Sequence, residues 1–180
     1  MLDATRVLLA EGVTPTVEQA AARAAISRTT AYRYFPNQRA LLIASYPELA
    51  APSLLDSEAS EDPAARLELV TESFGRQILE HEPELRAMLR LSLESPARGP
   101  EALPLRQGRA IGWILEALSP LGEHLTAAEQ RQLAIRIRSL AGIESLVWLV
   151  DVAGLSRKRA FEVMRQNAHA VLASAIDGDG

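Results

Sequence analysis

The chain has 180 residues, of which 48% are hydrophobic, and it carries a net charge of −4. This length and composition can bury a core of one or two small domains, so a disordered chain is excluded. The absence of cysteine excludes a disulfide framework and thiolate catalysis. The most apolar run, residues 140–152, contains two acids and is too short to span a bilayer. We therefore expect a soluble protein of the cytoplasm, with no membrane partner.

Apolar residues recur at helical spacing through almost every segment, which predicts an all-α protein. The first helix should span residues 2–11, with Val7 and Leu8 inward and Gly12 ending it. We divide the chain into an N-terminal three-helix domain, residues 1–45, and a C-terminal helical bundle, residues 46–180. Further helices are predicted over residues 17–24, 28–35, 38–45, 64–81, 83–94, 105–118, 126–152 and 156–176.

Two short helices around a tight turn form the next feature. Thr16 is placed to cap the first of them, and Gln19 three residues later can complete a capping box. Ser27 is placed to cap the second. This arrangement predicts a helix-turn-helix within the N-terminal domain.

The second of these helices has two different faces. Ala31 and Phe35 can pack inward, whereas Arg28, Thr29, Tyr32 and Arg33 fall on the opposite face. Arginine forks onto guanine edges and threonine contacts thymine methyl groups. Hydroxyl groups that can donate to phosphates come from Ser27, Thr30, Tyr32 and Tyr34. Residues 1–45 carry a charge of +2, which leaves −6 for the rest and favours DNA contact at one end.

Residues 16–42 resemble the DNA-binding domain of TetR/AcrR-family transcriptional repressors. The match consists of Thr16-Val17, the alanines that follow, the run ISRTTAYRYFP at residues 26–36, and Leu41-Leu42. The segment GIESLVWLVDVAGLS, residues 142–156, also resembles C-terminal domains of that family. The resemblance implies a homodimer that binds a palindromic operator in double-stranded DNA. It also implies release of the operator when a small-molecule effector enters the C-terminal domain.

Three positions depart from the family pattern. Ala25 stands where a turn glycine is usual, and it must either tolerate that backbone geometry or shift it. Gln38 replaces the usual lysine and can still donate to a phosphate. The basic residues that commonly precede the first helix have no counterpart before Leu2. We expect each departure to lower affinity without changing function. The candidate DNA-binding residues are Thr16, Ser27, Arg28, Thr29, Thr30, Tyr32, Arg33, Tyr34 and Gln38.

Two alternatives accompany this interpretation. A helix-turn-helix can serve packing alone, and Tyr34 can be mostly core with only its hydroxyl at the surface.

The C-terminal part contains polar residues among apolar neighbours. Glu144 and Asp151 lie in a run that is apolar nearly all round, which predicts a buried helix whose acids need partners. Apolar walls with a few convergent polar groups define ligand sites. The hypothesis is a ligand cavity lined by Arg90, Arg109, Trp113, Glu144 and Trp148. An ion-pair network or an interface contact explains the same residues equally well.

The last helix carries a continuous apolar stripe. It can cover the preceding helix within one bundle, or pair across a two-fold axis as a four-helix dimer interface. We favour the dimer, because a helix-turn-helix protein needs two copies to read two half-sites. The predicted interface residues are Phe161, Met164, Ala168, Val171, Leu172 and Ala175.

The sequence thus predicts a ligand-responsive transcriptional regulator, a repressor released from its operator by a small molecule. The alternative is a family member without operator binding that acts as a dimerisation or ligand-binding module. An enzyme is a distant third, because no catalytic triad motif or glycine-rich phosphate loop occurs. No metal site or cofactor is expected, since His81, His124 and His169 are far apart and have no ligand spacing.

Overall fold

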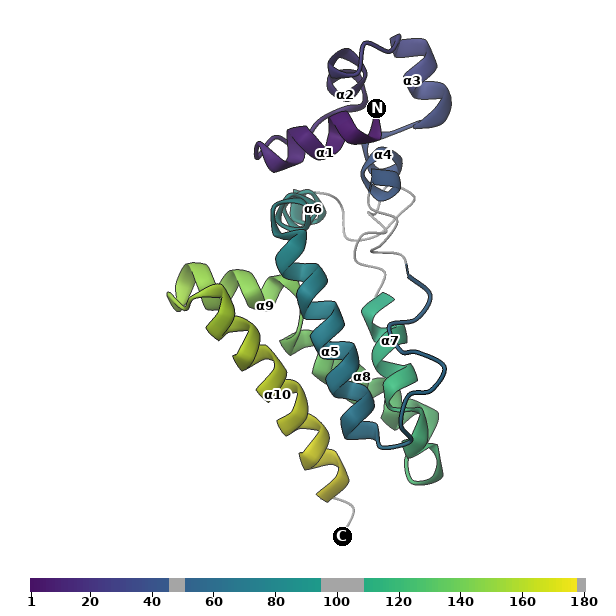
Figure 1. Ribbon diagram of the computed structural model, residues 1–180, viewed down its shortest axis with the longest axis vertical. Helices are drawn as coiled ribbons and strands as arrows, with labels where there is room; N and C mark the ends of the chain where they lie inside the picture. Colours follow the sequence, from purple (N-terminus) through teal and green to yellow (C-terminus); the bar gives the residue numbers. More distant parts are fainter. Residues whose placement is uncertain (46–50, 95–108, 178–180) are drawn as a thin grey trace. The chain divides into compact units, whose positions relative to one another are not determined.

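The computed structural model describes residues 1–45, 51–94 and 109–177, and the described residues form helices and connecting turns without a strand (Figure 1). The all-α prediction is confirmed. These residues group into two compact units. Unit 1 takes its residues from 1–51 and 81–107, and unit 2 from 52–80 and 108–180. Among the described helices, none is long and apolar enough to cross a membrane.

Unit 1 is built on two small apolar clusters. The first joins Val17, Ala20, Ala21, Ala31 and Leu41, and the second joins Leu9, Leu42 and Met88. Alanine makes up much of the first cluster, so its helices approach closely with little side-chain volume between them. The helices of unit 1 are α1 (Leu2–Ala10), α2 (Val17–Arg23), α3 (Arg28–Tyr34), α4 (Gln38–Ser45) and α6 (Glu82–Glu94).

Helix α1 turns a different face inward from the one that the sequence predicts. Val7 is 43% exposed, whereas Leu9 is 1% exposed and Thr5 is fully buried. The prediction for Val7 is wrong, because α1 lies against α4 and α6 along the Thr5 and Leu9 side. Arg6 fixes this position, since its Nε donates to the Ser45 carbonyl oxygen at 2.6 Å.

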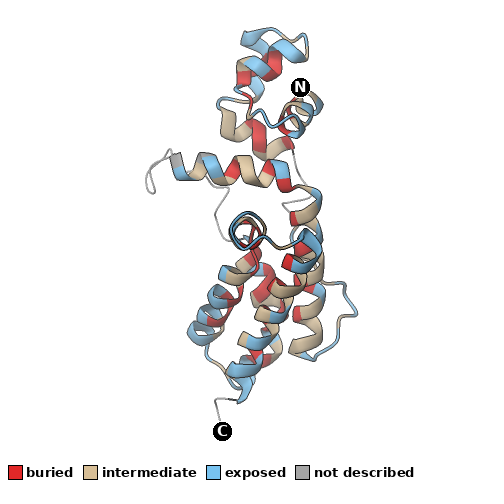
Figure 2. Ribbon diagram, turned by 90° about the vertical axis from the view of Figure 1, so that its left-hand side faces the viewer, coloured by how far each residue is buried: buried red, intermediate tan, exposed pale blue. Residues whose placement is uncertain are grey.

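Unit 2 is a helical bundle in which α10 packs on α5 and α8, and α7 packs on α5 and α8. Figure 2 shows the buried positions along the inward faces of these helices. The side chains of Leu67, Ile114, Ile137, Leu146 and Leu172 are each less than 3% exposed. Its elements are α5 (Pro63–Glu80), α7 (Arg109–Ala117), the 3₁₀ turn η3 (Ser119–Glu123), α8 (Ala127–Leu140), α9 (Ile143–Val147), the π-helical turn η4 (Trp148–Val152) and α10 (Arg157–Asp177).

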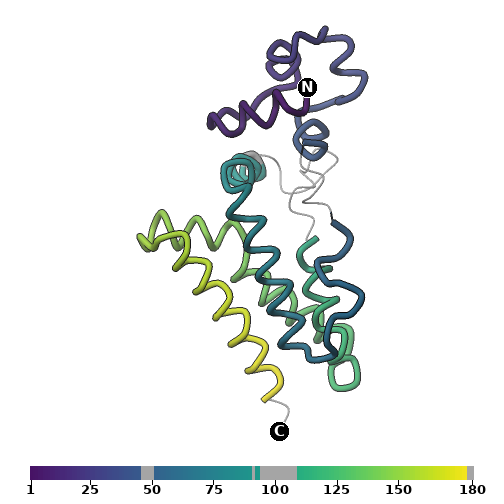
Figure 3. Tube along the Cα trace, viewed as in Figure 1, coloured from purple at the N-terminus to yellow at the C-terminus, as the bar shows by residue number. Residues whose placement is uncertain are grey.

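The single helix predicted over residues 126–152 is wrong. The start of this helix is confirmed, and the structure adds a capping box there, in which Glu129 N donates to Thr126 Oγ1 at 3.3 Å. The helix α8 ends at Leu140, and Gly142 starts α9 with an extended backbone. A Cβ at Gly142 would lie 1.8 Å from the Arg138 guanidinium, so any other residue here would have to displace the ends of the Arg138 and Glu144 side chains. The chain changes direction there, as Figure 3 shows.

The break also changes which residues beyond it are buried. Only Ile143, Leu146 and Leu149 face the core of unit 2, with exposed fractions of 8%, 0% and 9%. Trp148 is 58% exposed, and Asp151 is exposed as well. The prediction of a helix buried all round is therefore wrong, because one face of α9 and η4 is enough to close this end of the bundle.

The apolar stripe of α10 is used largely within the protomer. Met164, Ala168 and Leu172 are at most 3% exposed against the neighbouring helices. Phe161 lies over Gly75 of α5, where a Cβ would meet its ring at 2.0 Å. These residues therefore pack within one bundle, which is one of the two roles that the sequence allowed for the stripe. Because Met164, Ala168 and Leu172 are buried in the protomer, they are not available for a subunit interface. Val171 and Ala175 are half-buried.

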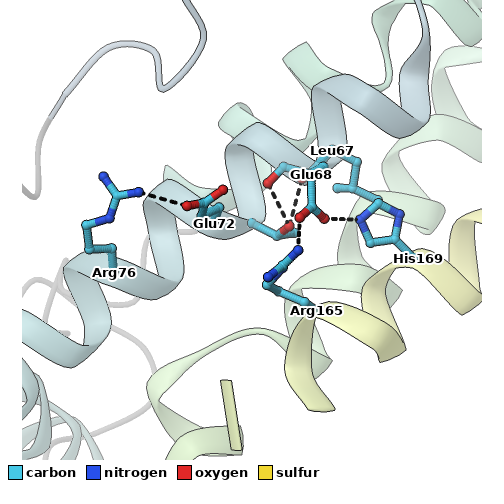
Figure 4. A network of polar contacts seen from close by, with 7 residues as sticks. Leu67, Glu68, Glu72, Arg76, Arg165 and His169 are labelled. Atoms are coloured by element: carbon cyan, nitrogen blue, oxygen red, sulfur yellow. Dashed lines mark hydrogen bonds and ion pairs between the residues drawn. The ribbon is translucent and has the colours of Figure 1, made fainter. Parts of the chain in front are cut away.

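A polar network joins α5 and α10 beside this stripe (Figure 4). The carboxylate of Glu68 pairs with the Arg165 guanidinium and also lies 2.6 Å from His169 Nε2. Burial and the nearby Arg165 lower the pKa of His169. The neutral imidazole therefore donates its Nε2–H to Glu68 while Arg165 balances the carboxylate charge.

The close approach of Gly75 and Phe161 yields a stability prediction. In Gly75→Ala the added methyl group clashes with the ring, and overpacking of this kind costs about 1–3 kcal/mol of unfolding free energy. Gly112→Ala in α7 is the matched control, because a Cβ there meets no atom within 4 Å. It should stabilise the protein by about 0.5–1 kcal/mol. Urea unfolding measures both, and equal effects of the two variants would contradict the packing.

The environment of His169 predicts a pH dependence. A folded-state pKa below the ordinary value of 6.5 means that the unfolded chain binds the proton more readily. The free energy of unfolding should therefore fall as the pH drops below 6.5. His169→Gln keeps a donor for Glu68 and should flatten this fall in urea titrations on both sides of pH 6.5. His124→Gln, at an exposed position, is the control. A slope that His169→Gln leaves unchanged would contradict the assignment.

Candidate nucleic-acid interface

The capping box predicted at the start of α2 is present. Gln19 N donates to Thr16 Oγ1 at 3.2 Å, and Thr16 N donates to Gln19 Oε1 at 2.8 Å. This pair satisfies two backbone donors that the first turn leaves without partners. It fixes where α2 begins relative to the loop that follows α1.

The turn between α2 and α3 uses a left-handed residue. Ala25 has a φ of 54°, and Ile26 N donates to the Ala21 carbonyl at 2.9 Å while Ala25 N donates to Ala22 at 3.2 Å. These two bonds close a Schellman motif, whose left-handed position usually holds glycine. Ala25 thus adopts the glycine geometry instead of shifting it.

The cap of α3 is also confirmed. Thr30 N donates to Ser27 Oγ at 3.2 Å, and the two hydroxyl oxygens lie 2.8 Å apart. Ala31 is 1% exposed, and Ile26 and Phe35 pack against the same cluster. The inward face of α3 is therefore the one that the sequence predicts.

The remaining face of α3 is exposed. Tyr34 is 68% exposed, so the alternative that it is mostly core is wrong. The Arg28 side chain is 75% exposed and Tyr32 is 36% exposed. The face combines guanidinium groups, hydroxyls and phenols on one short helix. Its exposed members are Ser27, Arg28, Thr29, Thr30, Tyr32, Arg33 and Tyr34.

The two candidate DNA-binding residues outside α3 and its cap, Thr16 and Gln38, are engaged within the chain. Thr16 is exposed but its hydroxyl caps α2. Gln38 Nε2 donates to the Pro15 carbonyl at 2.9 Å, so it holds the loop before α2. The start of α4 is capped instead by Asn37, whose Oδ1 accepts from Ala40 N at 2.8 Å. Sequence reasoning missed Asn37, although an asparagine three residues after Tyr34 is a recognisable cap.

Sequence reasoning also missed an acid beside the exposed face. Tyr32 Oη donates to Glu18 Oε1 at 2.5 Å, and Arg28 Nη2 lies 3.0 Å from the same oxygen. The Arg28 guanidinium also lies 5.7 Å from the Tyr32 ring centroid. The hydrogen bond from Tyr32 lowers the pKa of Glu18 and raises that of Tyr32. No spacing rule could find this contact, because Glu18 belongs to α2 and its partners to α3.

The five residues proposed as a ligand cavity are divided between the two units. Arg90 belongs to unit 1, where its Nη2 donates to Thr14 Oγ1 at 2.5 Å, and the other four belong to unit 2. Arg109 is exposed at the start of α7. Trp148 is exposed too, whereas Trp113 is only 4% exposed.

Two of these five residues are linked through neighbours that sequence reasoning missed. The Phe74 ring packs edge-on against Trp113 at 5.7 Å, and the Arg138 guanidinium lies 5.7 Å from the Phe74 centroid. Arg138 also pairs with Glu144 at 3.2 Å. This chain of contacts is an aromatic and ionic cluster within unit 2. Among the residues that the structure describes, no group of histidines and acids is arranged to hold a metal ion.

Two short capped helices, a tight turn and an outward polar face define a helix-turn-helix DNA-binding protein. Residues 1–45 match the model of the family described as bacterial regulatory proteins, tetR family. Residues 1–45 are therefore similar to the DNA-binding domain of TetR-family regulators, which confirms the resemblance read from the sequence. Proteins of this family are regulators and generally not enzymes. No curated protein and no solved structure matches the chain significantly.

The geometry of Ala25 leads to a prediction for the turn. An alanine in the left-handed conformation is strained by about 1–2 kcal/mol, and replacing it with glycine removes this strain. Part of that stabilisation is lost again, because glycine raises the conformational entropy of the unfolded chain. Ala25→Gly should therefore raise the free energy of unfolding by about 0.5–1 kcal/mol in urea. Ala24→Gly is the matched control, because Ala24 has a φ of −90° and gains nothing from glycine. Destabilisation by Ala25→Gly would contradict the left-handed turn.

Proposed function

We propose that the protein is a ligand-responsive transcriptional repressor that binds a palindromic operator as a homodimer. A small molecule bound by residues 46–180 releases the operator from the domain formed by residues 1–45. The protein would work in the cytoplasm, where its DNA lies.

The observation that carries this proposal is the exposed face of α3. Its inward side is held by Ala31, Ile26 and Phe35, so the helix cannot rotate to hide its polar side. The exposed side offers two guanidinium forks and several hydroxyl groups, the chemistry that reads base edges and phosphates. A packing-only helix-turn-helix would gain nothing from such a face.

Helix α6 supports the coupling of ligand to operator. It follows α5 directly in the chain, yet it packs on α1 within unit 1. Met88 of α6 shares a cluster with Leu9 and Leu42. A ligand that displaces α5 would therefore act on the DNA-binding helices through α6, and DNA would weaken ligand binding by the same factor.

We place the effector beside the aromatic and ionic cluster of Trp113, Phe74, Arg138 and Glu144. Aromatic walls with a few charged groups suit a small molecule. The contact between the two subunits would form along the part of α10 that is not buried within the protomer. It would include the half-buried Val171 and Ala175 and also Ile176, which is 48% exposed.

One observation favours the alternative of a module without operator binding. The side-chain amide nitrogen of Gln38 donates to the Pro15 carbonyl at 2.9 Å and to the Thr14 carbonyl at 3.4 Å, so the position where the family usually has a lysine supplies no charge and its donors are engaged within the chain. A protein of this kind would still dimerise and bind ligand.

Selection of bound duplexes from a random pool tests the proposal. We expect an inverted repeat whose affinity falls steeply with salt. Arg28→Ala should weaken binding of the selected site by about tenfold to a hundredfold, since a bidentate arginine contributes about 1–3 kcal/mol of discrimination. Arg23→Ala is the control. It removes the same charge from α2, where Arg23 faces Glu11 at 3.8 Å.

The outcomes separate the two candidate functions. Enrichment of a repeat together with the larger effect of Arg28→Ala supports the repressor. A folded dimer that enriches no sequence supports the module without operator binding. Equal losses of affinity for the selected site in the two arginine variants would show that the exposed face of α3 does not contact the bases.

A further inference from the structure

Glu18 is an acid placed on the surface that should meet an anionic polymer. It is one of only three acids in residues 1–45. Its Oε1 accepts from the Tyr32 hydroxyl at 2.5 Å and lies 3.0 Å from Arg28 Nη2. A carboxylate near phosphates is repelled by them, so its presence here needs a reason.

Stability is a poor reason. The Arg28 and Glu18 side chains are 75% and 39% exposed, and exposed ion pairs contribute little to folding. What the contact does achieve is orientation. A free arginine side chain loses rotamer entropy when it binds, and one already held in place loses less.

Glu18 also decides which partners Tyr32 can take. While the Tyr32 hydroxyl gives its proton to Glu18, its oxygen can only accept. Phosphate oxygens also only accept, so a phosphate can bond to the Tyr32 hydroxyl only if the hydrogen bond from Tyr32 to Glu18 is broken. The amino groups of adenine and cytosine are donors, and they fit the hydroxyl as it stands.

The guanidinium of Arg28 is treated differently. Glu18 occupies Nη2, and arginine has five N–H donors in all. Donors remain for a base edge in front of the helix. The negative charge of Glu18 nevertheless offsets part of the guanidinium charge, so Arg28 attracts phosphate less than a free arginine does.

We propose that Glu18 is a positioning residue that sets the sequence specificity of the recognition helix. It holds Arg28 and Tyr32 toward base edges and penalises DNA that offers phosphates alone. This inference rests on the proposed operator binding, and it assigns to α2 a part in reading sequence.

The test compares Glu18→Gln with the parent chain of 180 residues. Glutamine keeps an acceptor oxygen and removes the charge. Each protein is titrated with the operator selected by the parent and with an unrelated duplex at two salt concentrations. We expect the ratio of the affinity for the operator to the affinity for the unrelated duplex to fall by about tenfold. This is the change expected when one well-placed arginine contact to a base is lost. Binding to the unrelated duplex should tighten, and its salt dependence should steepen by about one counterion.

Glu11→Gln is the matched control. It removes the same charge from the same domain, beside Arg23 instead of Arg28. A fall in the ratio confined to Glu18→Gln supports the proposal. An unchanged ratio, or the same fall in both variants, overturns it.

A second measurement needs no DNA. Tyrosine labelled with ¹³C at Cζ reports the ionisation of Tyr32, whose pKa the Glu18 hydrogen bond raises. Glu18→Gln should move that pKa back toward its usual value. No movement would show that the contact is absent and would overturn the proposal.

The two proposals can fail separately. A parent chain that selects no sequence removes operator binding and this inference together. A parent chain that selects an operator, with Glu18→Gln reading it equally well, removes the role of Glu18 alone.

Discussion

The left-handed turn at Ala25 is the constraint on which the N-terminal domain depends. Its two backbone hydrogen bonds end α2, and the Ser27 cap begins α3 two residues later. With so short a connection, the angle between the helices has almost no freedom. That angle places Ala31 in the cluster with Ala20 and Ala21, and every exposed residue of α3 follows from it.

The alanines make this constraint effective. Because Ala20, Ala21 and Ala31 have small side chains, α2 and α3 approach closely and their polar residues come within reach of each other. The contact between Glu18 and its two partners is a consequence of that approach. A domain with a bulkier interior would hold the same residues too far apart for a hydrogen bond.

Unit 2 uses the same physical device at another place. Gly75 lets the Phe161 ring lie directly on the backbone of α5, and the Glu68 network then forms beside it. Small residues at crossing points let long helices pack without gaps, so ionic contacts can add orientation to an apolar interface. The break at Gly142 belongs to the same pattern, since the Arg138 guanidinium occupies the space that a side chain would fill.

The sequence by itself determined the local features. The all-α class, the four N-terminal helices, the caps of Thr16 and Ser27, and the inward face of α3 all depend on residues within a few positions of each other. Periodicity and capping express such short-range physics directly. The TetR resemblance rested on this same stretch.

Only the tertiary structure decided how distant residues meet. It turned Leu9 inward instead of Val7, broke the helix at Gly142 and exposed Trp148. It engaged Gln38 with Pro15, joined Arg90 to Thr14, and brought Glu18 to Arg28 and Tyr32. Helical spacing says which residues share a face of one helix, but which face is buried depends on where the neighbouring helices lie. That is set by packing across the whole unit, and no local pattern contains it.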